Sequence, residues 1–262
     1  MKGIRFDVFS LQGSGVYTTS SDVYSAPQLR IQDEKLAESD GSVIVKTSFE
    51  PRVFTCEGYM KGEGETPQEA SEDLDRLIDT FKQNLNKQNQ NFDIDYAGST
   101  RRYVATQRNM VISNEKGLDT AGWSVEFFCA NPVGADITES TLLADTVITT
   151  SSNTAGLTVD GSYKAEPLVT VTVTSVTGGT TNKTITISND STLRGVSVTR
   201  DWANGDVLEI DCLHKTLYVN NAAVEFGGQF PVWEPGNSGI SYLDDFTTRS
   251  ITMDASYVVR YL

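Results

Sequence analysis

Long apolar runs are missing from this 262-residue sequence. No stretch approaches the roughly eighteen apolar residues that a membrane-spanning helix needs. The first twenty positions also lack the unbroken hydrophobic centre of a secretion signal. We therefore expect no membrane partner and no export of the chain by itself.

Histidine and cysteine are scarce as well. The single histidine, His214, excludes sites that need two, including the common zinc hydrolase arrangements. The three cysteines, Cys56, Cys129 and Cys212, are odd in number and far apart, so their spacing fits neither a zinc site nor a redox motif. We expect them to be small buried apolar residues of a chain that folds in a reducing compartment.

Basic residues are outnumbered, because Lys plus Arg is 21 and Asp plus Glu is 35, which gives a net charge of −14. Nucleic acids and anionic membranes are held by clustered cations, so neither is expected as a bound partner. The clearest basic cluster is Arg101-Arg102 with Arg108 nearby, and contacts at a hairpin tip or with a neighbouring subunit explain it better than nucleic acid does. A hydrophobic content of 38% excludes wholesale disorder.

The sequence changes character near Asn131-Pro132-Val133-Gly134. Nine threonines lie before residue 135 and 21 lie from there on, while both halves stay acidic, at −6 and −8. The length also suits two domains of roughly 100 to 150 residues each. We therefore predict one domain over residues 1–134 and a second over residues 135–262.

The first half contains one amphipathic helix, at about residues 66–88. Thr66 and Glu69 form the pattern of a capping box, with Pro67 at the first helical position. The apolar stripe has helical spacing and consists of Ala70, Leu74, Leu77, Ile78, Phe81 and Leu85. We expect this stripe to pack on a sheet.

Strand patterns surround that helix and predict an α+β layer. They cover residues 4–9, 43–53, 92–96, 103–106, 110–113 and 123–129. The stretch from Gln12 to Ser42 is polar and weakly patterned, which is typical of long loops or of arms that need a partner to become ordered.

The second half reads as all β. In residues 168–176 the valines 169, 171 and 173 alternate with threonines, and Thr184–Ile187 repeats the alternation, which predicts a hairpin. Further short strands separated by turn signals favour a sandwich or jelly roll.

Few residues invite a chemical role. No nucleophile elbow or phosphate loop is present, so His214 is expected in a loop or at a strand edge. The acidic pairs Asp93/Asp95, Glu209/Asp211 and Asp244/Asp245 are typical of solvated faces. We expect no cofactor, no metal and no enzymatic activity.

Two tryptophans remain as binding candidates. Trp123 falls in a strand pattern and is expected in the core, whereas Trp202 and Trp233 fall at turns. They could stack on a sugar ring or be buried, and the sequence leaves both readings open.

The last sixty residues resemble the carboxy-terminal domain of siphophage distal tail proteins. The matching segments, in order and spacing, are Gly205–Asp211, Leu217–Asn220, Phe230–Asn237 and Tyr257–Leu262. Asn221 stands where that family usually has glycine, and Trp233 where it usually has leucine. The first half is similar in outline, with a helix and then a strand ending in the Phe127–Pro132 segment.

This resemblance implies a mainly β protein of two domains. The first would be an α+β, β-sandwich or split-barrel ring domain with one amphipathic helix, and the second a galectin-like β-sandwich. The implied function is that of a hexameric ring at the distal end of a non-contractile phage tail, which joins the tube to the baseplate or receptor-binding apparatus and leaves a channel for DNA. The implied place is the virion, after assembly in the host cytoplasm.

The partners implied are further copies of the chain, the tail tube protein, a tail hub or tape-measure-associated protein, and receptor-binding or baseplate proteins. DNA would pass without being held specifically. In that family a hairpin reaches the neighbouring subunit, and here we expect the 92–113 hairpin to do so through Phe92, Ile94, Tyr96, Arg101, Arg102, Tyr103, Met110 and Ile112.

Two other readings compete with the ring. A monomeric carbohydrate-binding sandwich that helps adsorption to the host surface would use Trp202 or Trp233. A glycoside hydrolase with an accessory sandwich would need an acid pair, and the sequence distinguishes none. The mass of the particle in solution separates a ring from a monomer.

Overall fold

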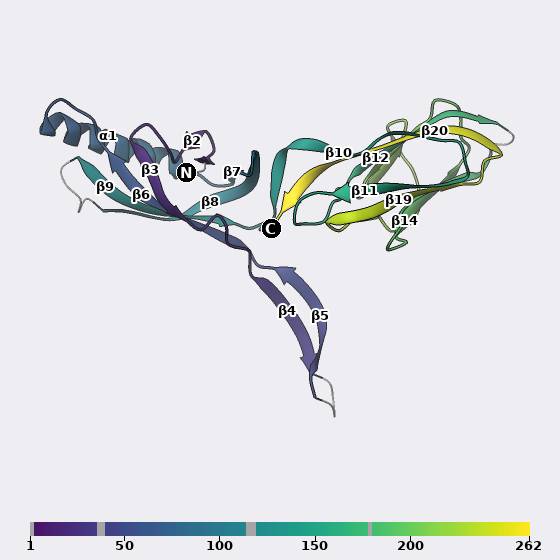
Figure 1. Cartoon of the computed structure of the whole chain (residues 1–262), viewed down its shortest axis with the longest axis horizontal. Helices are drawn as coiled ribbons and strands as arrows, with labels where there is room; N and C mark the ends of the chain where they lie inside the picture. The colour runs from purple at the N-terminus through teal and green to yellow at the C-terminus, as the bar shows by residue number, and fades with distance from the viewer. Residues whose placement is uncertain (1–2, 36–39, 114–118, 178–179) are drawn as a thin grey trace. The chain divides into compact units, whose positions relative to one another are not determined.

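The computed structural model describes residues 3–35, 40–113, 119–177 and 180–262. In these residues the chain forms one α-helix and many β-strands, so the predicted mainly β class is confirmed. The strands and the helix belong to two compact units (Figure 1). Unit 1 comprises residues 1–135 with Leu262, and unit 2 comprises residues 136–261.

Unit 1 is an antiparallel β structure with a helix against one sheet face (Figure 1). Neighbouring strands run in the orders β3-β6-β9-β8 and β8-β7-β1-β2. Its elements are β1 (Ile4–Phe6), β2 (Phe9–Ser10), β3 (Val16–Ser21), β4 (Leu29–Lys35), β5 (Ser42–Phe49), β6 (Arg52–Lys61), α1 (Pro67–Leu85), β7 (Gln90–Tyr96), β8 (Ser99–Ser113) and β9 (Thr120–Cys129).

Helix α1 begins where the capping box was predicted. The Thr66 hydroxyl accepts a hydrogen bond from the Glu69 amide at 3.2 Å, and the Glu69 carboxylate accepts one from the Thr66 amide at 3.0 Å. The helix ends at Leu85, three residues before the predicted end, because Asn86 leaves the helical conformation with ψ at 62°. No helix among the described residues is long and apolar enough to cross a membrane.

Strand β8 joins the two strand orders of unit 1. Its first part, through Ala105, pairs with β7, and its second part, from Thr106, pairs with β9. A bulge at Arg108 marks an irregularity in the second pairing, and such bulges bend and twist a strand. The aromatic core lies along this bend: the ring centroids of Phe92 and Phe127 are 4.7 Å apart, and those of Phe54 and Tyr103 are 4.9 Å apart.

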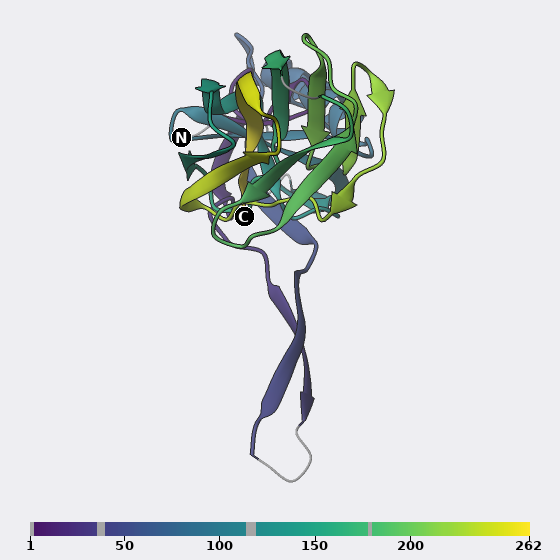
Figure 2. The same cartoon turned by 90° about the vertical axis from the view of Figure 1, so that its right-hand side faces the viewer.

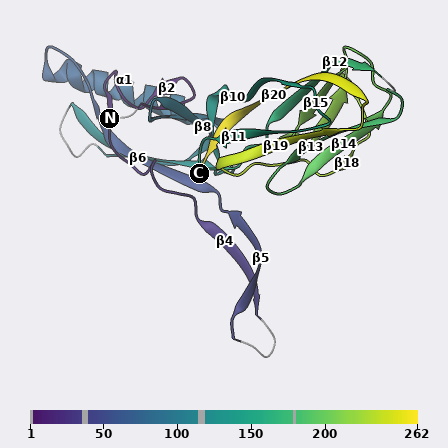
Figure 3. The same ribbon diagram turned by 45° about the vertical axis from the view of Figure 1, so that its right-hand side comes forward.

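Unit 2 is a sandwich of two antiparallel sheets (Figure 3). Within the unit the strand orders are β17-β16-β15-β12-β20-β10 and β11-β19-β13-β14-β18. The strands are β10 (Gly134–Ile148, whose first two residues belong to unit 1), β11 (Ser152–Val159), β12 (Leu168–Thr177), β13 (Lys183–Asn189), β14 (Gly195–Arg200), β15 (Val207–Asp211), β16 (Thr216–Val219), β17 (Ala222–Ala223), β18 (Gly227–Gly228), β19 (Gly236–Asp244) and β20 (Thr248–Tyr261).

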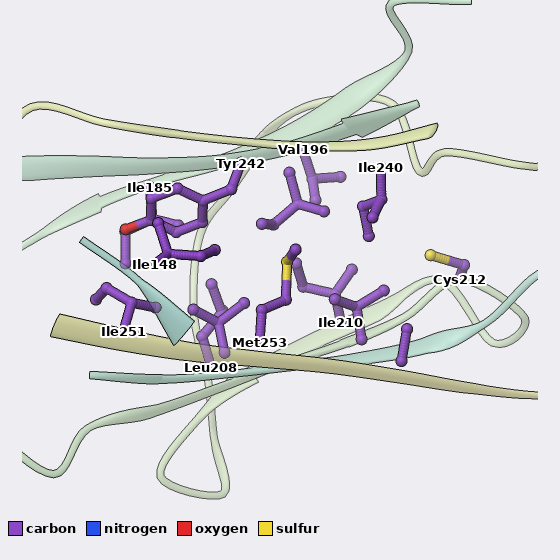
Figure 4. Close-up of a cluster of buried hydrophobic side chains, with 14 of the residues drawn as sticks. Ile148, Ile185, Val196, Leu208, Ile210, Cys212, Ile240, Tyr242, Ile251 and Met253 are labelled. Carbon is purple, nitrogen blue, oxygen red and sulfur yellow. The ribbon is translucent and has the colours of Figure 1, made fainter. Parts of the chain in front are cut away.

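The core of unit 2 fills the space between its sheets (Figure 4). Val169, Val171 and Val173 are fully buried, as the alternation predicted. The predicted hairpin between residues 168–176 and 184–187 is wrong, because β12 pairs with β15 and β20 while β13 pairs with β14 and β19 in the opposite sheet. The alternation identifies the buried face of a strand but does not say which sheet contains it.

The three cysteines are free thiols in these two cores. Cys56 and Cys129 lie in unit 1 and Cys212 in unit 2, and all are fully buried. Burial raises the pKa of each thiol to about 12. The prediction of small buried apolar residues is confirmed.

Candidate assembly surface

Strands β4 and β5 form a two-stranded ribbon that pairs with no other strand in the described chain. We call residues 29–35 and 42–49 the arm. All of β4 is exposed, and so is all of β5 except half-buried Phe49. Figure 2 shows the ribbon standing clear of the rest of unit 1. An isolated hairpin is marginally stable in water, and its open edges are templates for pairing with another chain.

The two faces of the arm differ in chemistry. Directly opposed residues in an antiparallel pair lie on the same face. One face carries Leu29 and Ile31 and, beyond a bulge next to Asp33, Ile44, which are 50%, 52% and 59% exposed. The opposite face carries Arg30, Gln32, Lys46 and Ser48, which together line one hollow of the surface, and beyond the bulge it carries Glu34 opposite Val43. The arm is therefore an amphipathic ribbon whose apolar side chains lie in solvent.

The chain leaves the arm at Arg52, which is only 4% exposed. Its Nη2 donates to the carbonyl oxygen of Val23 at 3.2 Å and to that of Ser25, and its Nη1 donates to the hydroxyl of Tyr103 at 3.3 Å. The guanidinium carbon lies 4.1 Å from the ring centroid of Phe54. Burial lowers the pKa of Arg52 and raises that of Tyr103.

The loop that enters the arm, residues 22–28, is fixed to β6 by its first residue. The Asp22 carboxylate accepts a hydrogen bond from the Thr55 amide at 2.8 Å, and the Asp22 amide donates to the Thr55 carbonyl at 3.2 Å. Burial is the main influence on Asp22 and raises its pKa. Where the arm begins, the Glu50 amide donates to the Gln28 carbonyl at 2.9 Å. We call this loop and Glu50–Arg52 the root of the arm.

The predicted contact set lies on β7 and β8, which pair so that Phe92 faces Tyr103 and Ile94 faces Arg101. Phe92, Ile94 and Tyr103 are at most 2% exposed and belong to the core of unit 1. The prediction is wrong for these three side chains, because a residue buried in its own unit cannot meet a neighbour.

The other five members of that set lie nearer the surface of unit 1. The Arg102 guanidinium makes two hydrogen bonds to the Asp93 carboxylate, at 2.8 and 2.9 Å. The Arg101 guanidinium stacks 3.7 Å above the Tyr96 ring. Met110 and Ile112 are half-buried against the core. A contact of these residues with a neighbouring subunit stays a prediction.

The two tryptophans proposed for sugar contact are both buried. Trp202 is 3% exposed and donates from its indole nitrogen to the Lys183 carbonyl at 2.9 Å. Trp233 is fully buried and donates to the Gly239 carbonyl at 2.9 Å. The prediction is wrong for both, because neither ring offers a free face and each indole N–H has an internal partner.

The groups considered for catalysis have ordinary structural partners. His214 Nδ1 lies 2.6 Å from the Asp211 carboxylate; His214 is exposed in the turn that follows β15, and half-buried Asp211 is the last residue of that strand. Asp244 is buried and forms an ion pair with Arg249 at 2.9 Å. Among the described residues no group of three or more His, Cys, Asp or Glu side chains is placed to hold a metal ion.

The arm itself is what the sequence interpretation missed. One strand was expected over residues 43–53, but the structure has β5 and β6 separated at Glu50-Pro51. The signal available was the short alternation of Leu29 and Ile31 with Arg30 and Gln32, inside a stretch interpreted as loop. Proline after a strand-like run was a second signal, because it lacks the amide that would continue the ladder.

Residues 160–261 match the family model of the siphovirus-type tail component, C-terminal domain. This segment of unit 2 thus belongs to the C-terminal domain family of siphovirus-type tail components. The matched segment covers most of unit 2, with strands from both sheets of the sandwich but without β10 and β11. The protein is thus a structural component of a bacteriophage tail and so of the virion. No curated protein matches the chain.

A solved structure is similar in fold to the chain over its whole length. The Dit protein of phage SPP1, described as a paradigm of the hub adsorption apparatus in phages that infect Gram-positive bacteria, is 16% identical, with a TM-score of 0.69 and full coverage of both chains. The two proteins share a fold across both units.

Other solved structures are only weakly similar to the chain. The phage P2 baseplate with Ca is 8% identical, with a TM-score of 0.42 and 98% coverage of both chains. A fructofuranosidase of Schwanniomyces occidentalis is 6% identical, with a TM-score of 0.24. The match covers 89% of this chain and 59% of the fructofuranosidase chain.

Proposed function

We propose that six copies of this tail component form a ring at the distal end of a long, non-contractile tail. The ring joins the tail tube to the baseplate or receptor-binding apparatus and leaves a channel for DNA. The observation that carries the proposal is the arm, an amphipathic ribbon with its apolar face in solvent. The full-length likeness to the SPP1 Dit fold supports it.

A closed ring suits the arm for a geometric reason. An arm that docks on a different surface of the next copy makes a heterologous contact, and such contacts close into rings when the rotation between subunits allows it. Leu29, Ile31 and Ile44 are about half exposed, so burying what remains of each supplies about half of the roughly 1.5 to 3 kcal/mol for a full transfer, which is still a useful driving force. The arm then gains the partner that its own unit does not provide.

The remaining partners follow from that position in the tail. They are the tail tube protein, a tail hub or tape-measure-associated protein, and receptor-binding or baseplate proteins. The ring would assemble in the host cytoplasm and act mechanically, without catalysis, cofactor or membrane. The net charge of −14 per chain suits a channel through which DNA passes without being held.

Trp202 and Trp233 no longer support the alternative of a carbohydrate-binding module, because both side chains are buried.

Electron microscopy of the purified full-length protein tests the ring. We expect particles with six-fold symmetry and a central opening. Particles of another symmetry, or single chains at every concentration, would refute the proposed ring.

A further inference from the structure

Arg52 is an unusual residue to find buried at the root of the arm. Its side chain has no carboxylate within ion-pair distance among the described residues, and its Nε has no hydrogen-bond partner there. The Asp22 carboxylate is close enough to attract the guanidinium but forms no ion pair with it, so part of the cost of removing this cation from water is left uncompensated. The position is tolerated because the guanidinium makes other contacts.

Those contacts connect three segments of unit 1. Nη2 binds two carbonyl oxygens of the loop that enters the arm, those of Val23 and Ser25. Nη1 binds the Tyr103 hydroxyl on β8. The plane of the guanidinium lies over the Phe54 ring of β6. A planar fork with several donors can satisfy all of these at once, whereas a lysine ammonium is a compact point charge that cannot.

Tyr103, which accepts a hydrogen bond from Arg52, also packs against Gly134 near the end of unit 1. An added Cβ at Gly134 would lie 2.5 Å from the Tyr103 ring and 2.8 Å from its hydroxyl oxygen. The backbone at Gly134, where β10 begins, therefore packs directly on the residue that accepts from Arg52. The root of the arm and the start of β10 rest on one buried side chain.

We propose that Arg52 is the positioning residue of the arm: it fixes the loop 22–28 against β6 and β8, and so sets the direction in which the arm leaves unit 1. This inference rests on the proposed function, because direction matters only if the arm must reach a neighbouring copy. Without Arg52 the arm would still form but would sample many directions, and docking would bear the entropy of ordering it.

Hydrogen exchange on the full-length protein tests the proposal, with Arg52→Lys as the variant. The Ser25 amide donates to the Asp22 carbonyl at 2.9 Å and the Thr55 amide to the Asp22 carboxylate at 2.8 Å, so both report on the root. We expect their exchange to become about tenfold faster while α1 and β9 keep their protection. Assembly should weaken in parallel.

The matched control is Arg108→Lys, on β8 of the same unit. The Arg108 side chain is 61% exposed and lies 3.8 Å from the Glu126 carboxylate, so replacing this cation with lysine should change nothing at the root. If Arg52→Lys behaves like this control, or speeds exchange equally in α1 and β9, the positioning role is wrong.

A second variant, Tyr103→Phe, keeps the ring and removes the hydroxyl that accepts from Arg52. It should speed exchange at the same amides by a smaller factor, and it decides the matter if Arg52→Lys does not fold. Unchanged exchange at the root in Tyr103→Phe would then overturn the proposal. The exchange measurement works on monomers, so a wild-type chain that never assembles would refute the ring and leave this test intact.

Discussion

The two units place their apolar side chains differently. In unit 2 the valines of β12 point between two sheets, and the threonines between them are half-buried or exposed on the outer face. In unit 1 the helix and its sheet enclose a similar core, but Leu29, Ile31 and Ile44 of the arm remain in solvent. Unit 2 also exposes single apolar side chains, such as Val147 at 64% and Leu193 at 81%, but these lie on its own sandwich, whereas the arm is a ribbon that pairs with no other strand of the described chain.

This difference predicts that assembly stabilises unit 1 and leaves unit 2 unaffected, because a partner stabilises only the part of the folded state to which it binds. Substitutions that change the assembly or stability of one unit and leave the other unchanged test this difference.

The largest effect is expected from charges on the apolar face of the arm. The double substitution Ile31→Asp and Ile44→Asp should weaken assembly at least about a hundredfold, because a buried carboxylate without a partner opposes docking. Sedimentation velocity measures the loss. Val147→Asp is the matched control, since Val147 is 64% exposed on β10 of unit 2. Equal assembly of the arm variant and the control would remove the arm from the interface.

A core substitution should break unit 2 alone. Trp233→Ala removes a fully buried ring and its hydrogen bond to the Gly239 carbonyl. We expect a loss of about 3 to 5 kcal/mol in the free energy of unfolding of unit 2, measured by urea unfolding. Unit 1 should unfold at the same urea concentration as in the wild-type chain. If Trp233→Ala leaves the stability of unit 2 unchanged, the indole of Trp233 does not pack in its core.

Gly134→Ala should strain unit 1 by a smaller amount. The added methyl would lie 2.5 Å from the Tyr103 ring, so the ring or β10 must shift, at a cost of about 1 to 3 kcal/mol. Gly156→Ala on β11 is the control, because nothing lies within 4 Å of its added Cβ. Equal melting temperatures for the two variants would contradict the close approach at Gly134.

The smallest effect is expected for chemical labelling of the cysteines in the native protein. Cys56 and Cys129 report on unit 1, and Cys212 reports on unit 2. Burial raises the pKa of Cys56, Cys129 and Cys212 to about 12, so few thiolates exist at pH 8 and labelling by iodoacetamide should be negligible. Unfolding returns these pKa values to about 8.5 and exposes the thiols. Rapid labelling of any of them in the native state would contradict their burial.

The same shift fixes the sign of a pH dependence. Because the folded pKa lies above the unfolded one, each thiol contributes stability that is fully present below about pH 8.5 and is lost as the pH rises toward 12. Urea unfolding at pH 8 and at pH 10 should show this loss. A chain with the three cysteines replaced by alanine serves as the reference. If the wild-type chain loses no more stability than this reference between pH 8 and pH 10, the thiols do not contribute to the pH dependence.

Local signals explain which parts of the fold could be predicted. The capping box at Thr66 acts within four residues, so it identified the start of α1 without tertiary information. The alternation in β12 identified its buried face. The partner of β12 could not be predicted, because packing across the sandwich places β13 in the other sheet.

The candidate site was harder to predict for two physical reasons. A turn position did not reveal that Trp202 and Trp233 fold back into the core. The arm buries almost nothing within its own unit, so its sequence carries little of the pattern that a core imposes. The alternation puts Leu29 and Ile31 on one face, but Ile44 joins that face only through its pairing with Asp33 beyond the bulge, which the sequence does not reveal.

Hydrogen exchange of the arm, residues 29–35 and 42–49, across a concentration series that spans assembly decides whether another copy covers this ribbon. We expect fast exchange in dilute single chains and strong protection in the assembled ring, with the sandwich of unit 2 unchanged between the two. An arm that exchanges equally fast in both states would contradict it.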